Sequence, residues 1–152
     1  SASLSVAKLF SESDEHFNEV SVGLRRLFES EFEQGQIILK LDTLHDTGYF
    51  ASLGASFGEA VEDRLAMRQS FNATVGANVR NKPLIASFSY SHSDGGRLFG
   101  FSRDDKTAAF NLTYAVHPNM NVSLGYSETN SSISYFDDSG AIFGVQFSPL
   151  RF

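Results

Sequence analysis

Five charged side chains lie among small polar residues, and their types could support proton or ion chemistry. They are Glu19, Arg25, Lys40, Asp42 and Arg68. Each falls on the polar side of an alternating stretch, which predicts that all five point into the same interior. An isolated buried charge costs several kcal/mol or shifts its pKa. We therefore expect a structural network that closes the interior, with Lys40 against Asp42 or Glu19, rather than a path for ions.

The four histidines do not show a metal-binding or catalytic spacing. His16, His45, His92 and His117 fall in predicted turns, loops or strand ends, and no HxxxH or HExxH spacing occurs. The sequence therefore predicts no metal site, no cofactor and no catalytic residue. His92, between Ser91 and Ser93, is the one position that could serve a lipid-modifying enzyme, and this alternative stays open.

The chain around these residues alternates between apolar and polar side chains. The stretch 107–128 contains two alternating segments joined by a tight turn. The apolar side of these segments carries Phe110, Leu112, Tyr114, Val122 and Leu124. Period-two alternation across a tight turn predicts a β-hairpin. The polar side holds Asn, Ser, Thr and Gly instead of Lys or Glu. Such a side suits the crowded interior of a narrow barrel, and the apolar side suits lipid.

The same pattern recurs along the chain and predicts an all-β, up-and-down antiparallel transmembrane β-barrel of about eight strands. Connections near 45–48, 80–83 and 117–119 are short, whereas those near 29–35, 58–64, 92–106 and 129–140 are longer. This alternation is typical of bacterial barrels, which have even strand numbers. A strand within residues 1–10 would make the number odd. We therefore expect residues 1–16 to form an arm or short helix, and residues 17–152 to form the barrel domain.

Composition limits the alternatives. The chain has 152 residues, which favours one domain, and its net charge of −6 argues against a nucleic-acid partner. No run approaches the roughly 18 apolar residues of a spanning helix. There are 15 Phe and no Trp, so Phe supplies most of the aromatic surface. The chain contains no Cys, which excludes disulfides and thiolate chemistry.

Four tyrosines fit a barrel with two membrane interfaces. Tyr49 and Tyr114 fall near the short turns, and Tyr90 and Tyr126 fall near the long connections. Aromatic girdles at both interfaces predict this placement, because the ring is apolar and the hydroxyl prefers water.

The chain resembles a small outer-membrane β-barrel of Gram-negative bacteria, similar to the transmembrane domain of the OmpA family. The resemblance covers about residues 17–152 and rests on the alternation, the connection lengths and the C-terminal Phe152 with Leu150, which resemble the family's assembly signal. It implies a place in the cell outer membrane, with the lipid bilayer, lipopolysaccharide and the barrel assembly machinery as partners.

The resemblance implies a membrane anchor or structural protein that contacts other molecules through its long loops. We expect these loops at 91–106 and 127–140, where Phe99, Phe101 and Tyr135 could anchor another envelope protein. The pattern alone also permits a soluble, lipocalin-like barrel with its apolar side inward around an apolar ligand. A pore for small solutes is disfavoured by the strand count.

Overall fold

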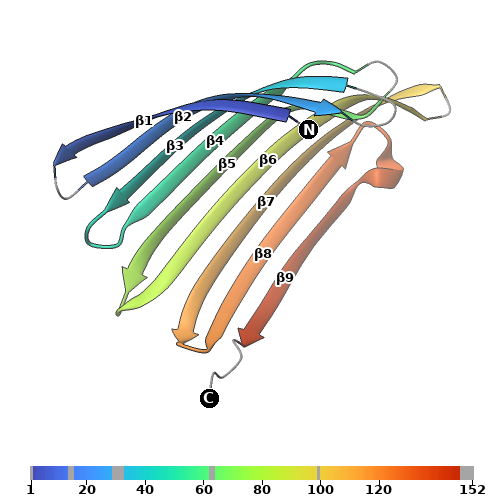
Figure 1. Cartoon of the computed structure of the whole chain (residues 1–152). Coiled ribbons are helices and arrows are strands. Elements are labelled where there is room, and N and C mark those ends of the chain that lie inside the picture. The colour runs from blue at the N-terminus through green and yellow to red at the C-terminus, as the bar shows by residue number, and fades with distance from the viewer. Residues whose placement is uncertain (1, 14–15, 29–32, 62–63, 99, 148–152) are drawn as a thin grey trace.

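The protein forms a single antiparallel sheet. A computed structural model describes residues 2–13, 16–28, 33–61, 64–98 and 100–147. Its nine strands are hydrogen-bonded in chain order, each to the next (Figure 1). They are β1 (Ala2–Ser13), β2 (His16–Phe28), β3 (Glu33–His45), β4 (Phe50–Gly58), β5 (Ala66–Val79), β6 (Lys82–Leu98), β7 (Phe101–His117), β8 (Met120–Ser131) and β9 (Asp138–Phe147). The predicted all-β, up-and-down antiparallel architecture is confirmed.

The prediction of an arm or helix over residues 1–16 is wrong. Residues 2–13 form β1, which pairs with β2 through matches such as Leu4 with Leu24 and Val6 with Val22. The error came from assuming an even strand number, which is a property of closed barrels. This sheet is open: within the described residues β1 pairs only with β2, and β9 only with β8. The strand number is nine instead of about eight.

Two predicted long loops are shorter than expected. Residues 92–106 belong mostly to a hairpin, because β6 continues to Leu98 and β7 begins at Phe101. Between β8 and β9 lies η1 (Ser134–Phe136), a single 3-10 turn. Strand pairing uses backbone groups, so it continues where the side chains become polar and the alternation signal is lost. Among the described residues, no helix is long or apolar enough to cross a membrane.

The short turns have the backbone conformation that their residues favour. Gly48 has a φ of 84°, as expected for the predicted turn after His45. Arg80 and Asn81 have φ values of 52° and 60° and join β5 to β6. Two consecutive positive φ values are typical of a type I′ turn, whose twist matches that of the flanking strands. These turns and the β7–β8 turn lie together at one end of the sheet, called the short-turn end below (Figure 1).

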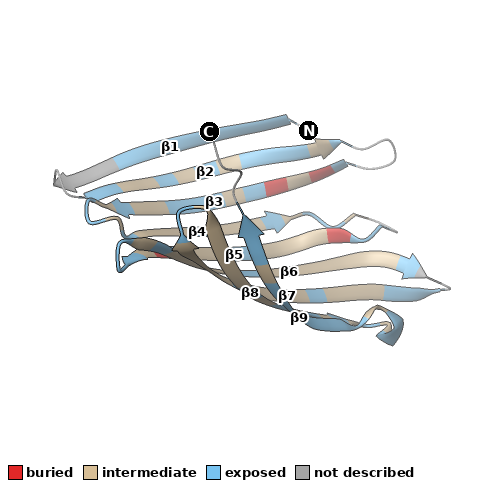
Figure 2. Ribbon diagram, turned by 90° about the horizontal axis from the view of Figure 1, so that it is seen from below, coloured by how far each residue is buried: buried red, intermediate tan, exposed pale blue. Residues whose placement is uncertain are grey.

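The register separates the side chains into an apolar face and a polar face. Opposite residues share a face, so rows such as Leu24, Ile37 and Phe57 are apolar, while rows such as Ser21, Lys40 and Gly54 are not. Large apolar side chains remain exposed across the sheet, for example Leu24 at 60%. Ala66 is the one buried hydrophobic residue of the described chain (Figure 2). The described residues therefore form no hydrophobic core of their own.

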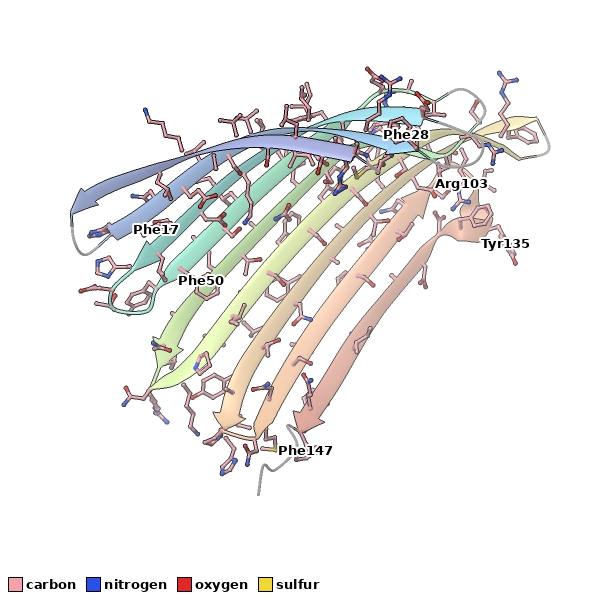
Figure 3. The ribbon with its side chains drawn as sticks, viewed as in Figure 1. Phe17, Phe28, Phe50, Arg103, Tyr135 and Phe147 are labelled. Atoms are coloured by element: carbon pink, nitrogen blue, oxygen red, sulfur yellow. The ribbon has the colours of Figure 1, made fainter. Side chains whose placement is uncertain are left out.

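The polar face lies on the inner side of the curved sheet, where side chains crowd together. The ring of Phe50 covers Gly76 on the neighbouring strand, so that a Cβ at Gly76 would come within 2.0 Å of the ring (Figure 3). Asn72 covers Gly54 in the same way. A curved sheet brings side chains together on its concave face, which explains why Gly and Ser are common there.

A small buried amide network fastens the sheet at the other end. Gln34 is 2% exposed, and its amide nitrogen donates to the carbonyls of Glu59 and Met67 at 2.8 Å each. Gln36 in turn donates to the Gln34 side-chain oxygen at 2.9 Å. These bonds join β3 to Glu59 in the connection between β4 and β5 and to Met67 in β5, so the start of this connection is held against the sheet.

Replacing Gly76 with Ala should destabilise the sheet. The added Cβ cannot fit beneath the Phe50 ring unless the ring or backbone moves, which should cost about 1–3 kcal/mol. Gly140 is the matched control, because a Cβ there meets nothing within 4 Å. Urea unfolding of the two variants in detergent micelles tests this. Equal midpoints for G76A and G140A would contradict the packing described.

Candidate functional site

The predicted interior charges separate into two groups. Lys40 and Asp42 lie two residues apart on β3, with Nζ and Oδ2 2.6 Å apart, and Glu19 lies opposite Asp42 on β2. Arg25 shares this polar face, opposite Gln36. The Lys40 side chain is 52% exposed, so this pair faces solvent in the open sheet.

Arg68 does not join that group. It lies at a β-bulge, where the pairing of β5 with β6 shifts between Met67 and Gln69. Its Nε is 3.6 Å from the Asp94 carboxylate. A bulge adds one residue to a strand and redirects the side chain, which the alternation in the sequence could not reveal.

Arg68 belongs to a set of charges called here the rim cluster, which consists of Arg68, His92, Asp94, Asp104 and Lys106. His92 Nε2 is 2.8 Å from Asp104 Oδ2, and Lys106 Nζ is 3.9 Å from the other oxygen of Asp104. The register places His92 and Asp104 on the apolar face, directly beyond its last apolar residues. The rim cluster therefore ends the apolar surface at the end of the sheet opposite the short turns.

Three rim-cluster residues have atoms that could bind a metal ion. The ligand atoms of His92, Asp94 and Asp104 lie within 4.8 Å of one another. Two cations, Arg68 and Lys106, already balance the two carboxylates. A divalent ion would have to compete with both, so the geometry is better described as a network of ion pairs.

His92 lies in β6 and not in a loop, and its side chain is only 19% exposed. Its chain neighbours Ser91 and Ser93 occupy the opposite face, because successive side chains in a strand alternate. A serine nucleophile needs its histidine within hydrogen-bond reach. These two serines therefore do not form a nucleophile–base pair with His92.

The other histidines lie at the short-turn end. His16 and His45 meet edge to face with ring centroids 4.2 Å apart, and His45 Nδ1 is 2.7 Å from Asp46. His117 accepts the backbone N–H of Asn119 at 3.2 Å. All three lie at turns or strand ends, as the sequence predicted.

A second cluster forms on the polar face beside η1. Arg103 binds Asp105 through two nitrogens, at 2.6 and 3.0 Å, and its guanidinium carbon lies 3.7 Å from the centroid of the Phe136 ring. Ser131 donates to the same carboxylate at 2.6 Å. Asp105 is only 12% exposed. Burial opposes ionisation of Asp105, but the hydrogen bonds from Arg103 and Ser131 outweigh it and hold the pKa of this carboxyl below its usual value.

Further hydrogen bonds hold the β8–β9 connection against β7. Ser132 donates its hydroxyl to the Ser102 carbonyl at 3.0 Å, and its backbone N–H donates to the Asp104 carbonyl at 2.8 Å. Asp104 N–H donates to the Ser132 hydroxyl at 2.9 Å. This connection is thus an ordered platform, called here the η1 platform (residues 131–137 with Arg103 and Asp105).

The η1 platform presents one of the predicted contact residues. Tyr135 is 86% exposed and contacts Phe136 edge to face, with centroids 5.2 Å apart (Figure 3). Phe101 begins β7 at the hairpin tip and is 71% exposed. Phe99, Leu150 and Phe152 lie outside the described residues. Tyr135 and Phe101 therefore offer aromatic surface at the same end of the sheet.

The four predicted girdle tyrosines lie at the two ends of the apolar face. Tyr90 stacks on Phe71 with centroids 6.4 Å apart, and the Tyr126 hydroxyl donates to Glu128. At the short-turn end the Tyr114 hydroxyl donates to the Val79 carbonyl, and Tyr49 is 57% exposed. The hydroxyl contacts of Tyr114 and Tyr126 each join the ring to a polar group beside the apolar surface.

Sequence reasoning missed the η1 platform. The sequence predicts a long polar loop over residues 92–106, and a loop implies no pairing for Arg103 or Asp105. One signal was present: Arg103 and Asp105 are two apart, as side chains on one face of a strand must be. Nothing in the sequence places Phe136 beside them, because that contact depends on the path of the β8–β9 connection.

Protonating Asp105 should loosen the η1 platform. The pKa of Asp105 is lower in the folded protein than in the unfolded chain, where it is about 3.9. The ionised carboxylate therefore stabilises the platform at pH values above the unfolded-state pKa, and this stabilisation is lost as the pH falls through the lowered pKa of the folded state. In Asp105→Asn the platform should lose protection already at neutral pH. Hydrogen-exchange protection factors of the Ser131 and Ile133 amides measure this.

The exposed Asp138 supplies the control for that experiment, since Asp138→Asn should leave both amides protected. Unchanged protection in D105N at neutral pH would show that Asp105 does not hold the platform.

No protein-family model, curated protein or solved structure matches this chain in the comparisons made. Its function is therefore argued from the geometry of the sheet and of its two clusters.

Proposed function

We propose that this chain forms the wall of an outer-membrane β-barrel of a Gram-negative bacterium. In this role it anchors in the bilayer through its apolar face and contacts other envelope molecules through the end that carries the η1 platform. The observation that carries the proposal is a sheet face covered by exposed Leu, Val, Ile and Phe, in a chain whose described residues bury one hydrophobic side chain.

The apolar surface has the shape of a belt. It ends at the rim cluster and Glu128 on one side, and at His16, His45 and Arg80 on the other. Between these limits, β6 offers outward residues from Leu84 to Tyr90 and β5 offers those from Phe71 to Val79. A rise of about 3.3 Å per residue makes such runs comparable to the apolar band of about 25 Å in outer-membrane barrels.

The belt also runs obliquely to the hydrogen-bonded rows. A row here is a series of directly opposite residues on successive strands. The row that starts at Val22 is apolar in β2–β5, but its member in β8 is the charged Glu128. The row that contains Leu124 is apolar in β8 and reaches Thr43 and Asn18 in β3 and β2. Strands that are tilted against a flat apolar layer produce this drift, and barrel strands are tilted by about 35–45°.

A soluble, lipocalin-like protein fits these observations less well. In that arrangement the bulky side chains would meet in a dry centre. Here Leu53, Phe71 and Phe110 remain 49%, 40% and 43% exposed. The crowded inner face instead holds Asn72 over Gly54 and many small residues, with a group of bulky residues, Phe17, Leu44 and Phe50, near the short-turn end. The apolar face therefore requires cover from outside the sheet, and lipid supplies it without a specific partner.

The contact role rests on the η1 platform. Rigid scaffolds commonly carry binding residues on connections, and Tyr is frequent at protein contacts because it gives large area for little lost freedom. Tyr135 stands on a connection held to β7 by several hydrogen bonds. The inner charges Glu19, Arg25, Lys40 and Asp42 line the barrel interior in this proposal.

Tryptophan placed on the two faces should report lipid contact on one of them. The chain has no Trp, so Phe110→Trp on the apolar face and Asn111→Trp on the polar face each give a single reporter at the same depth. In vesicles that contain brominated lipid, F110W should be quenched strongly and N111W weakly. A water-soluble folded monomer, or equal quenching in the two variants, would contradict the proposal.

A further inference from the structure

The two edge strands are long, apolar on one face and unpaired along their outer sides within the described residues. β1 spans Ala2–Ser13, and β9 spans Asp138–Phe147. Their apolar side chains are among the most exposed of the sheet: Leu4 is 73%, Val6 72% and Phe143 69% exposed. In contrast, Leu41 in β3 is 39% exposed. Within the described residues, each edge strand is hydrogen-bonded to a neighbouring strand on one side only.

Free edges cannot stay free in a bilayer. Each unpaired backbone N–H or C=O in hydrocarbon costs several kcal/mol, so membrane sheets close. The curvature of this sheet leaves β1 and β9 apart. Nine strands therefore do not complete the wall, and further strands must meet both edges.

The direction of the edge strands limits which strands can pair with β1 and β9. In an up-and-down sheet β1 and β9 run the same way, away from the end that carries the η1 platform. Antiparallel pairing of β1 with β1 of a second copy would turn that copy upside down. Outer-membrane barrels keep their long loops on one side, which excludes an inverted copy. A second copy in the same orientation brings its β1 beside β9 as a parallel pair, which is only slightly less stable per residue.

The two edges match in chemistry when they are parallel. Most outward positions are apolar on both, with Leu4 and Val6 on β1 and Phe143 and Val145 on β9, whereas Lys8 of β1 is a charged outward residue. Inward positions mix small and larger residues on both edges, with Ser5 and Leu9 on β1 and Gly144 and Ile142 on β9. A copy beside β9 therefore continues the apolar belt through its Leu4 and Val6.

We propose that two copies of this chain close one barrel through two parallel seams, each between β9 of one copy and β1 of the other. The inference rests on the proposed membrane function. Doubling the nine strands gives a barrel in the size class of 16–18 strands, which encloses an aqueous channel. Water in this channel solvates Lys40 and Asp42, which explains how the inner face tolerates charges.

Cysteine cross-linking tests the seam, and the chain has no native Cys to interfere. Ser5→Cys is combined in turn with Gly140→Cys, Ile142→Cys, Gly144→Cys and Gln146→Cys, all on the polar face. The proteins are reconstituted in lipid vesicles and treated with a short thiol cross-linker. At least one double variant should give a covalent species of twice 16.7 kDa, while each single variant stays monomeric.

Three results would overturn the seam. Covalent dimers of S5C alone or G144C alone would show antiparallel, inverted pairing. A cross-link within a single 16.7 kDa chain would show that one copy closes on itself. Absence of any cross-link in all four double variants would show that β1 and β9 of two copies do not pair. If F110W is still quenched by brominated lipid, each result leaves the membrane proposal standing.

Discussion

One constraint governs this molecule: a wide apolar face with no protein to cover it. Burial of a Val, Leu or Phe side chain is worth about 1.5–3 kcal/mol, and folded domains of this length normally collect that energy in a core. Here the buried ones among the described residues are Gln34, Gln36, Ala66 and Gly76, and no large apolar side chain among them is buried. Hydrogen bonding between neighbouring strands gives the sheet its order, but the free energy that keeps it folded must come largely from whatever meets that face.

The remaining features fit around this constraint. Small residues on the polar face let the sheet curve, with Phe50 over Gly76 and Asn72 over Gly54 filling the inner side. Charges collect where the apolar belt ends, in the rim cluster, and there they pair with one another. The η1 platform lies at the same end and is fastened by Arg103, Asp105 and Ser131. The chain thus separates a wide apolar face from a polar, ordered platform at one end of the sheet.

The sequence predicted the faces of the residues within the alternating stretches of β2–β9, because a period of two is visible without knowing the pairing. It placed Phe110 and Asn111 on opposite faces correctly, and it located the turns at Gly48 and Arg80. The prediction missed β1 because it assumed an even number of strands, although Leu4 and Val6 do alternate with polar residues. Arg68 was misplaced because a bulge breaks the period, and the contact of Arg103 with Phe136 depends on tertiary placement.

The central claim is that lipid covers the apolar face and water covers the polar one. Spin labels placed one at a time at residues 108–116 of β7, in protein reconstituted in vesicles, test it most directly by their collision rates with oxygen and with a water-soluble nickel complex. Oxygen accessibility should be high at 108, 110, 112 and 114 and low between them, and nickel accessibility should alternate in the opposite phase. A flat profile, or nickel access highest at the Phe110 and Leu112 positions, would contradict this account.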